Sequence, residues 1–320
     1  MLTVFPPPPA GHPPHRIPPE TVWIDLFDAD APARQAVAAA TGLHVPTRDE
    51  LSEIETSSRL ARRGAALYLS MPGLAHTAAG MPNNLPIGFV LAADRLLTLR
   101  FARQDAIETY VAQCRAEPLA DTSSTGLLAG LFEALVERIA DLLEREAEEL
   151  NGVSRRVFRA APRAGRPRHA QLALRALLQT VGRVGDLVSK ARETLLAFAR
   201  LIPFVVANAA WITAEQKSRF KVLRADIASL ADYAGHLAAK VEFLMEATVG
   251  FIGIEQNNII RLLTVVSVVG VPPTFLASLW GMNYRAMPEL SWEWGYPMAL
   301  GLIVLSAILP ILLFRRRGWL

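Results

Sequence analysis

Two long stretches without a charged residue lie near the C-terminal end of the sequence. Leu262–Trp280 and Tyr296–Phe314 each contain 19 residues and no Asp, Glu, Lys, Arg or His. About 20 mainly apolar residues are enough for a helix to cross the roughly 30 Å hydrocarbon layer of a bilayer. The sequence therefore predicts two transmembrane helices, and its 52% hydrophobic content fits a chain partly embedded in lipid.

Basic residues predict how these spans are oriented. Four arginines flank the spans on the side away from their connecting loop: Arg261, Arg315, Arg316 and Arg317. The loop itself carries one arginine against two glutamates. Because Lys and Arg accumulate on the cytoplasmic side, both termini are expected in the cytoplasm. The prolines near the N-terminus leave no apolar core for a signal peptide, so a two-pass protein of the cell (inner) membrane is expected.

The N-terminal part predicts a cytosolic α/β domain. Residues 1–20 are rich in proline and are expected to form a disordered arm. Residues 21–120 alternate β-like runs with helical stretches, which is typical of an α/β fold. The expected strands are 22–27, 66–71, 87–92 and 95–101, and the expected helices are 49–60 and 105–117.

The remainder of the chain is predicted to be helical. Apolar residues recur every three or four positions from Leu127, and a basic, proline-containing turn follows, so 121–212 is expected to form a helical hairpin. No proline occurs between Pro203 and Pro272, and an apolar seam follows heptad-like spacing. One stalk helix at 213–281 is therefore predicted, continuing into the first transmembrane helix. The last predicted segments are the outer loop at 282–295, the second transmembrane helix at 296–314 and a basic cytoplasmic tail at 315–320.

A stripe of mostly small or polar residues runs along the first span and its approach. Its members alternate steps of three and four residues: Asn257, Ile260, Thr264, Ser267, Val271, Thr274, Ser278 and Gly281. A parallel ring of such helices would line a narrow, mildly polar pore, although small residues also serve close helix packing. Neither span contains an Asp, Glu, Lys, Arg or His residue, which favours a channel over a proton-coupled carrier.

Other classes of function have little support in the sequence. Cys114 is the only cysteine, so neither an intrachain disulfide nor a thiolate metal cluster can form. The sequence has no P-loop, GxGxxG, HExxH or GxSxG motif, so an enzyme is not expected and no cofactor is predicted. The net charge of +3, without aromatic residues interleaved among basic ones, argues against nucleic acid as a partner.

The loop after the first span carries a short motif. Trp280-Gly281-Met282-Asn283-Tyr284 is followed by Met287-Pro288-Glu289-Leu290 and by Trp294-Gly295-Tyr296-Pro297. This order, between two C-terminal spans and before a basic tail, resembles the CorA family of divalent-cation (magnesium) channels with their Gly-Met-Asn signature.

The resemblance implies a CorA-like funnel, a homopentamer whose five first spans enclose a pore for hydrated Mg²⁺ entering the cell. It implies a selectivity filter at Gly281, Met282 and Asn283, with the Asn283 amide contacting the ion through its hydration shell. Asn257, Thr264 and Thr274 resemble the polar pore-lining positions of the family, and the stripe adds Ser267 and Ser278. Ile260 and Val271 stand where the family has an apolar gate.

Some features depart from the family pattern. Trp280 replaces a tyrosine, and Pro273 doubles a single proline. The family's regulatory metal site uses an aspartate on the stalk, where this chain has Val222. Asp226 and Asp232 are the closest aspartates and are therefore the candidates for a regulatory metal site.

Two alternatives to a magnesium channel remain open at this point. One is a CorA-fold transporter for Zn²⁺, Co²⁺ or Ni²⁺, since the sequence cannot rank hydrated dications of similar size. The other is a membrane scaffold or sensor that does not conduct ions.

Overall fold

The computed structural model describes residues 2–7, 17–53, 59–76, 82–160, 167–283, 287–288 and 292–319. The chain forms two compact units. The first contains Met1–Arg155 and Gln179–Leu244, and the second contains Arg156–Leu178 and Met245–Leu320.

The first unit contains a six-stranded sheet in the order β1-β2-β6-β5-β4-β3. The strands are β1 (Leu2–Phe5), β2 (Trp23–Phe27), β3 (Leu60–Arg63), β4 (Ala66–His76), β5 (Pro82–Leu91) and β6 (Leu96–Arg100). Only the β2–β6 pair is parallel among the described strands; the other neighbours are antiparallel. The sheet confirms the predicted α/β class.

Helices cover both faces of the sheet. Ile24 and Leu26 of β2 point to the face covered by α1 (Ala31–Thr41) and α2 (Arg48–Ser52), where they join one apolar cluster. Successive side chains of a strand point to opposite faces. On the other face Trp23 therefore meets Tyr110 of α4 (Asp105–Ala116), with their ring centroids 5.8 Å apart.

That second face contains a buried ion pair. Arg100 donates hydrogen bonds to both carboxylate oxygens of Asp25 at 2.9 to 3.3 Å, and the two side chains are 7% and 2% exposed. Thr98 donates to Asp25 at 2.6 Å, while Trp23 donates to Thr98 at 3.2 Å. Every lone pair that Asp25 brings into the interior therefore has polar partners close by, as a buried charge requires.

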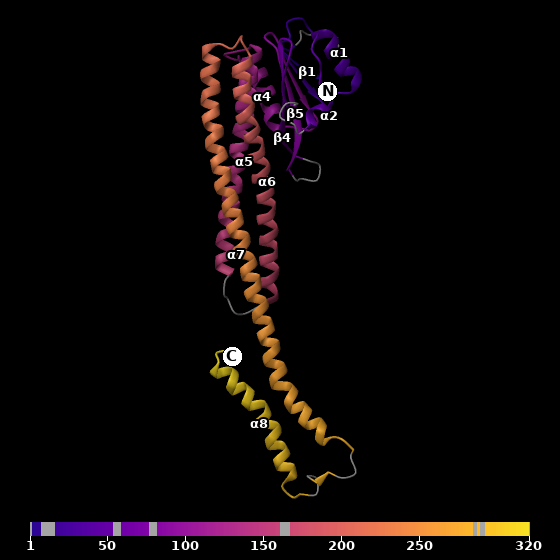
Figure 1. The fold of residues 1–320 in the computed structure, drawn as a ribbon, viewed down its shortest axis with the longest axis vertical. Coiled ribbons are helices and arrows are strands. Elements are labelled where there is room, and N and C mark those ends of the chain that lie inside the picture. The colour runs from indigo at the N-terminus through magenta and orange to yellow at the C-terminus, as the bar shows by residue number, and fades with distance from the viewer. Residues whose placement is uncertain are drawn as a thin grey trace. The chain divides into compact units, whose positions relative to one another are not determined.

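Three long helices pack beside the sheet in the first unit (Figure 1). They are the parts of α5 (Ser124–Ala160), α6 (Pro167–Asn208) and α7 (Ala214–Trp280) that belong to this unit. Phe132 of α5 joins the sheet to the helices, because its ring lies 5.2 Å from Phe89, 5.1 Å from Phe198 and 6.5 Å from Phe220. The structure has α7 at Ala214–Trp280, where the sequence predicts one stalk helix at 213–281.

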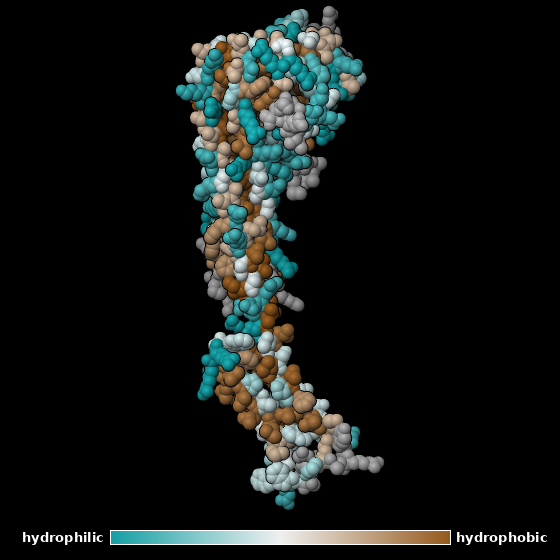
Figure 2. Space-filling view, viewed as in Figure 1, coloured by the Kyte–Doolittle hydropathy of each residue, from teal (hydrophilic) through white to brown (hydrophobic). Residues whose placement is uncertain are grey.

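The second unit contains the C-terminal part of α7 and α8 (Gly295–Arg316), with apolar residues over much of their surface (Figure 2). Both helices are long and apolar enough to cross a membrane. Near its C-terminal end α8 meets α7, since the Arg261 guanidinium lies 5.8 Å from the Trp319 ring centroid. Trp319 in turn stacks on Phe314.

Two predictions about local structure are wrong. Residues 2–5 of the expected disordered arm form β1, because Leu2 and Val4 find a partner in β2 and pack against the apolar cluster. Residues 8–16 of the arm lie outside the described residues. The helix expected at 49–60 is too long at its C-terminal end: α2 ends at Ser52, residues 54–58 lie outside the described residues, and Leu60 belongs to β3, where pairing with β4 overrides local helix propensity. The helix α1 was not predicted.

The acidic run at 144–149 has one buried member. Glu146 is 3% exposed and faces Arg183 of α6, which contacts both Glu146, at 3.5 Å, and Glu149. Burial raises the pKa of Glu146 more than the neighbouring Arg183 lowers it. Glu144 and Glu148 are exposed, as expected for a solvated helix face.

We expect Asp25→Asn to lower the free energy of unfolding by about 3–5 kcal/mol, since it removes the buried partner of the Arg100 charge and leaves only the partly exposed Glu108, at 3.3 Å. Thermal and denaturant unfolding of the purified full chain would measure this loss. Arg103→Gln is the matched control, because Arg103 is 72% exposed and contacts the same Glu108 as Arg100. A loss of similar size in both variants would contradict the role given to burial.

Glu146→Gln should change the pH dependence of stability. Because the pKa of Glu146 is raised on folding above the ordinary 4.5, its stabilising protonated form is lost as pH rises through the raised value. The variant should therefore gain melting temperature relative to the natural chain between acidic and neutral pH. Glu148→Gln, on the exposed side of the same helix, should show no such gain. Parallel melting curves of the two variants would contradict this account.

Candidate ion pathway

The predicted stripe lies on an open face of α7. Seven of its eight members are exposed, and Thr264 is half-buried. The two apolar members are among the most exposed, at 60% for Ile260 and 63% for Val271. Exposed aliphatic side chains at helical spacing indicate a surface that another chain or lipid covers.

A different face of the same helix is covered within the chain. Val265 is 8% exposed, and Val269, Pro272 and Leu276 are half-buried. At about 100° per residue, this row lies roughly opposite the stripe. The side of α7 that packs within its own chain is therefore not the side that carries the polar residues.

Two threonines of the stripe have their hydroxyl protons engaged. Thr264 donates to the carbonyl of Ile260 at 2.8 Å, and Thr274 donates to that of Gly270 at 2.7 Å. Such bonds within a helix are common, and by themselves they are equally compatible with a stripe that serves only close helix packing. They also leave the lone pairs of the hydroxyl oxygens available as acceptors. Each oxygen can then accept a hydrogen bond from water.

Pro272 and Pro273 lie inside α7 without ending it. Two successive backbone N–H groups are missing, so the carbonyls one turn earlier, near Val268 and Val269, lose their usual helical donors. In a membrane such carbonyls are tolerated where protein or water covers them.

The Gly-Met-Asn segment follows the last turn of α7. The Gly281 amide donates to the Ala277 carbonyl at 3.0 Å, and that of Met282 donates to Leu279 at 3.4 Å. A Cβ at Gly281 would lie 3.2 Å from the Ala277 oxygen, so a larger residue would disturb this end of the helix. Gly281, Met282 and Asn283 are all exposed. Residues 284–286 and 289–291 of the motif region lie outside the described residues.

A cavity of about 410 Å³ separates the start of α8 from the end of α7. Its lining includes Trp280, Trp292 and Tyr296 together with small residues of α8. Trp280, which departs from the family pattern, therefore faces an aromatic hollow between the two helices of one chain.

The structure does not bring the two candidate regulatory carboxylates together. Asp226 and Asp232 are exposed on α7, and among the described residues no group of three or more His, Cys, Asp or Glu could hold a metal ion. One chain alone therefore does not supply a complete regulatory metal site in the part that the structure describes.

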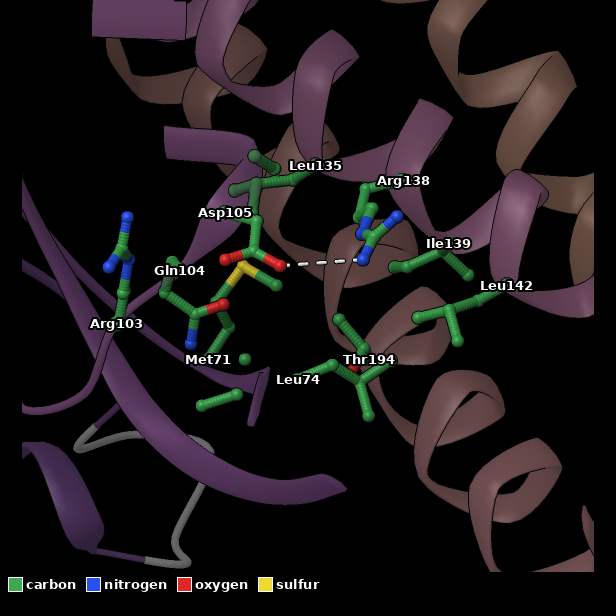
Figure 3. Close-up of a pocket in the computed structure, with 13 residues that line it drawn as sticks. Met71, Leu74, Arg103, Gln104, Asp105, Leu135, Arg138, Ile139, Leu142 and Thr194 are labelled. Carbon is green, nitrogen blue, oxygen red and sulfur yellow. Dashed lines mark hydrogen bonds and ion pairs between the residues drawn. The ribbon is translucent and has the colours of Figure 1, made fainter. Parts of the chain in front are cut away.

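Two cavities of the first unit are not part of the candidate ion pathway. One of about 30 Å³ lies between the sheet and α4, α5 and α6, and its polar side chains include the Asp105–Arg138 pair at 3.4 Å (Figure 3). A polar hollow of about 730 Å³ is lined by residues that include Asp121 and Glu133. Glu133 pairs with Arg219 at 2.5 Å. Burial would raise the pKa of Asp121, but hydrogen bonds from Gln216 and Ser123 lower it overall. The sequence did not reveal this hollow, because its residues come from two stretches that are far apart in the chain, 110–137 and 213–219.

Comparisons with known proteins agree with the geometry. Residues 19–316 match the family model described as CorA-like Mg²⁺ transporter protein. The chain is 34% identical over 301 residues to the magnesium transport protein CorA of Salmonella typhimurium, covering 94% of this chain and 92% of the relative. The corresponding protein of Escherichia coli is 35% identical over 299 residues, covering 93% and 92%.

Solved structures share the fold at lower identity. The complete CorA magnesium transporter from Methanocaldococcus jannaschii superposes with a TM-score of 0.69 at 16% identity, over 93% of this chain and 91% of that one. The full-length CmaX protein gives 0.63 at 20% identity, over 95% and 90%. The predicted resemblance and the predicted layout of an α/β domain, a long helix and two apolar C-terminal helices are thus confirmed. The chain belongs to the family of CorA-like Mg²⁺ transporter proteins.

Proposed function

We propose that this chain is a subunit of a homopentameric membrane channel that conducts hydrated Mg²⁺ into the cell. It crosses the inner membrane twice, and both termini lie in the cytoplasm. Family membership supports the proposal, as do relatives named for magnesium transport. The observation that carries it is the open stripe of α7, which lies roughly opposite the row that packs within the chain.

The chemistry of the stripe suits an ion that keeps its water. Mg²⁺ dehydrates reluctantly, and the water molecules around it present their hydrogens outward. Neutral oxygens can accept these hydrogens without binding the ion so tightly that it cannot leave. Asn257, Thr264, Ser267, Thr274 and Ser278 supply such oxygens in successive rings of five.

Asn283 is the proposed contact of the outer mouth. Its side-chain amide offers both an acceptor and donors, and it is exposed at the end of the helix that carries the stripe. Gly281 permits the close turn at the end of α7, and Met282 stands between Gly281 and Asn283. Five such amides would form a ring around one hydrated ion.

The barrier to conduction is assigned to the two apolar members of the stripe. Rings of Ile260 and Val271 side chains would exclude water from a narrow pore, which blocks a hydrated ion without any bound ligand. Internal Mg²⁺ bound at Asp226 or Asp232 is expected to contribute little to closure, since within the described residues of one chain neither carboxylate belongs to a group of three or more His, Cys, Asp or Glu side chains that could hold a metal ion.

Asn283→Ala should reduce Mg²⁺ uptake about tenfold or more, since a hydrogen bond to a charged group contributes ~1.5–3 kcal/mol. Uptake is measured with purified chain in liposomes that contain a Mg²⁺-sensitive dye. Native mass spectrometry of the same sample shows whether the variant still assembles.

Tyr296→Phe is the control, because it removes a polar group of similar size at the same end of the second unit but off the stripe. Normal Mg²⁺ uptake by an assembled Asn283→Ala variant would contradict the filter assignment. Uptake of Zn²⁺, Co²⁺ or Ni²⁺ in place of Mg²⁺ would favour the alternative transporter. If the natural chain transported no dication at all, the remaining alternative would be a membrane scaffold or sensor that does not conduct ions.

A further inference from the structure

The helices α5 and α6 carry a strong positive charge where the chain turns from one to the other. The residues Arg156–Ala160 of α5 and Pro167–Leu178 of α6, here called the hairpin end, contain four arginines and one histidine but no Asp or Glu. The sequence between them, 161–166, adds two more arginines. The net charge of the whole chain is only +3, so this segment is much more basic than the remainder. The proposed ion pathway makes no use of this charge.

Local helix stability does not explain where the arginines stand. Arg168 and His169 lie in the first turn of α6, which has no acidic residue. The N-terminal end of a helix has a positive dipole, which favours acidic side chains and bound anions and disfavours cations. Positive charge at this place has to be offset by water or by a negatively charged partner.

The hairpin end belongs to the same compact unit as the two apolar C-terminal helices. That unit contains Arg156–Leu178 together with Met245–Leu320. Phe158, in the last turn of α5, packs on Phe251 of α7, with the ring centroids 6.0 Å apart. Phe251 precedes Leu262, the first residue of the first predicted span, by eleven residues, or about 16 Å of helix.

The C-terminal end of α5 is the end nearer the first span. In the first unit α5 and α7 run in the same direction, because Phe132 lies near Phe220 and the Lys240 ammonium donates to the side-chain oxygen of Asn151. The headgroup layer extends roughly 5–7 Å beyond the hydrocarbon. About 10 Å then separate the level of Phe251 from the headgroups, which is close to the ~8 Å Debye length at physiological ionic strength.

Exposed apolar side chains accompany the positive charge. Arg156 and Arg175 are exposed, and so are Phe158, at 48%, and Leu172, at 65%. Basic residues beside exposed aromatic and aliphatic ones are typical of protein surfaces that lie on an anionic bilayer. The position and the composition of the hairpin end therefore indicate the same partner.

We infer that the hairpin end binds anionic phospholipid headgroups on the membrane surface at the Arg261 end of the first span. The inference rests on the proposed function, whose topology places that surface in the cytoplasm. The negative potential of an anionic leaflet attracts basic segments that lie within about a Debye length of it. Through Phe158 and Phe251 the bound hairpin end would brace α7 just before Asn257, where the stripe begins.

Fluorescence quenching in nanodiscs of defined lipid composition tests this contact. The full chain with Cys114→Ala and Leu172→Cys carries a bimane label, and a nitroxide on phosphatidylcholine headgroups quenches a label that lies at the bilayer surface. Leu172 is exposed, so the label should not disturb packing. Quenching should be strong when the bilayer contains phosphatidylglycerol and weak in phosphatidylcholine alone. Salt at about 0.5 M should weaken it, because salt screens the attraction.

Arg159→Gln/Arg168→Gln should reduce the quenching in phosphatidylglycerol nearly to the level in phosphatidylcholine. Each arginine near an anionic surface strengthens binding about fivefold, and these two stand at the adjoining ends of α5 and α6. Arg192→Gln/Arg200→Gln is the matched control, because it removes the same charge from exposed positions further along α6, and it should leave the quenching unchanged. Quenching that is absent with phosphatidylglycerol, or that survives Arg159→Gln/Arg168→Gln, would overturn the inference.

A second label distinguishes this failure from that of the proposed function. Trp319 lies beside Arg261, so a bimane on Trp319→Cys should be quenched in both lipid compositions if the two spans cross the bilayer as proposed. Quenching at residue 319 without phosphatidylglycerol-dependent quenching at residue 172 removes the hairpin contact alone. The absence of quenching at both residues contradicts the proposed membrane topology as well.

Discussion

The structure depends on the two faces of helix α7, one of which packs within its own chain while the other is left open. One face is apolar and buried, against α5 and α6 in the first unit and within the second unit at Val265. The other face carries small, polar and aliphatic residues that its own chain leaves uncovered. A 67-residue helix with a persistent open face is stable only if other copies or solvent complete it. The oligomer and the pore proposed above both depend on that open face.

The polar groups of this face inside the membrane are uncharged, and this determines which ions the face can accommodate. Rings of charged side chains inside a membrane would be costly and would hold a dication tightly. Hydroxyl and amide oxygens are weaker ligands, and the engaged hydroxyl protons of Thr264 and Thr274 turn those oxygens into acceptors. Such a surface fits an ion that passes with its hydration shell.

Much of the helical part could be predicted from the sequence, because it is encoded locally. Charge-free runs, the absence of proline and the 3.5-residue spacing predicted α7 and the face that carries the stripe. The sequence was less informative where distant segments decide the structure. Leu2–Phe5 becomes a strand only because β2 offers an open edge, and Leu60 leaves the expected helix to pair with β4. The burial of Glu146 depends on α6, which no local pattern around the acidic run reveals.

Cysteine crosslinking tests most directly whether the open face of α7 meets other copies. The buried Cys114, the one cysteine of the sequence, is first replaced by alanine. Ser267→Cys, on the stripe, should then form disulfide-linked dimers in membranes under mild oxidation. Val265→Cys, on the covered row of the same turn, should not. Efficient crosslinking at Val265 with none at Ser267 would place the stripe away from the other copies and contradict the proposed pore.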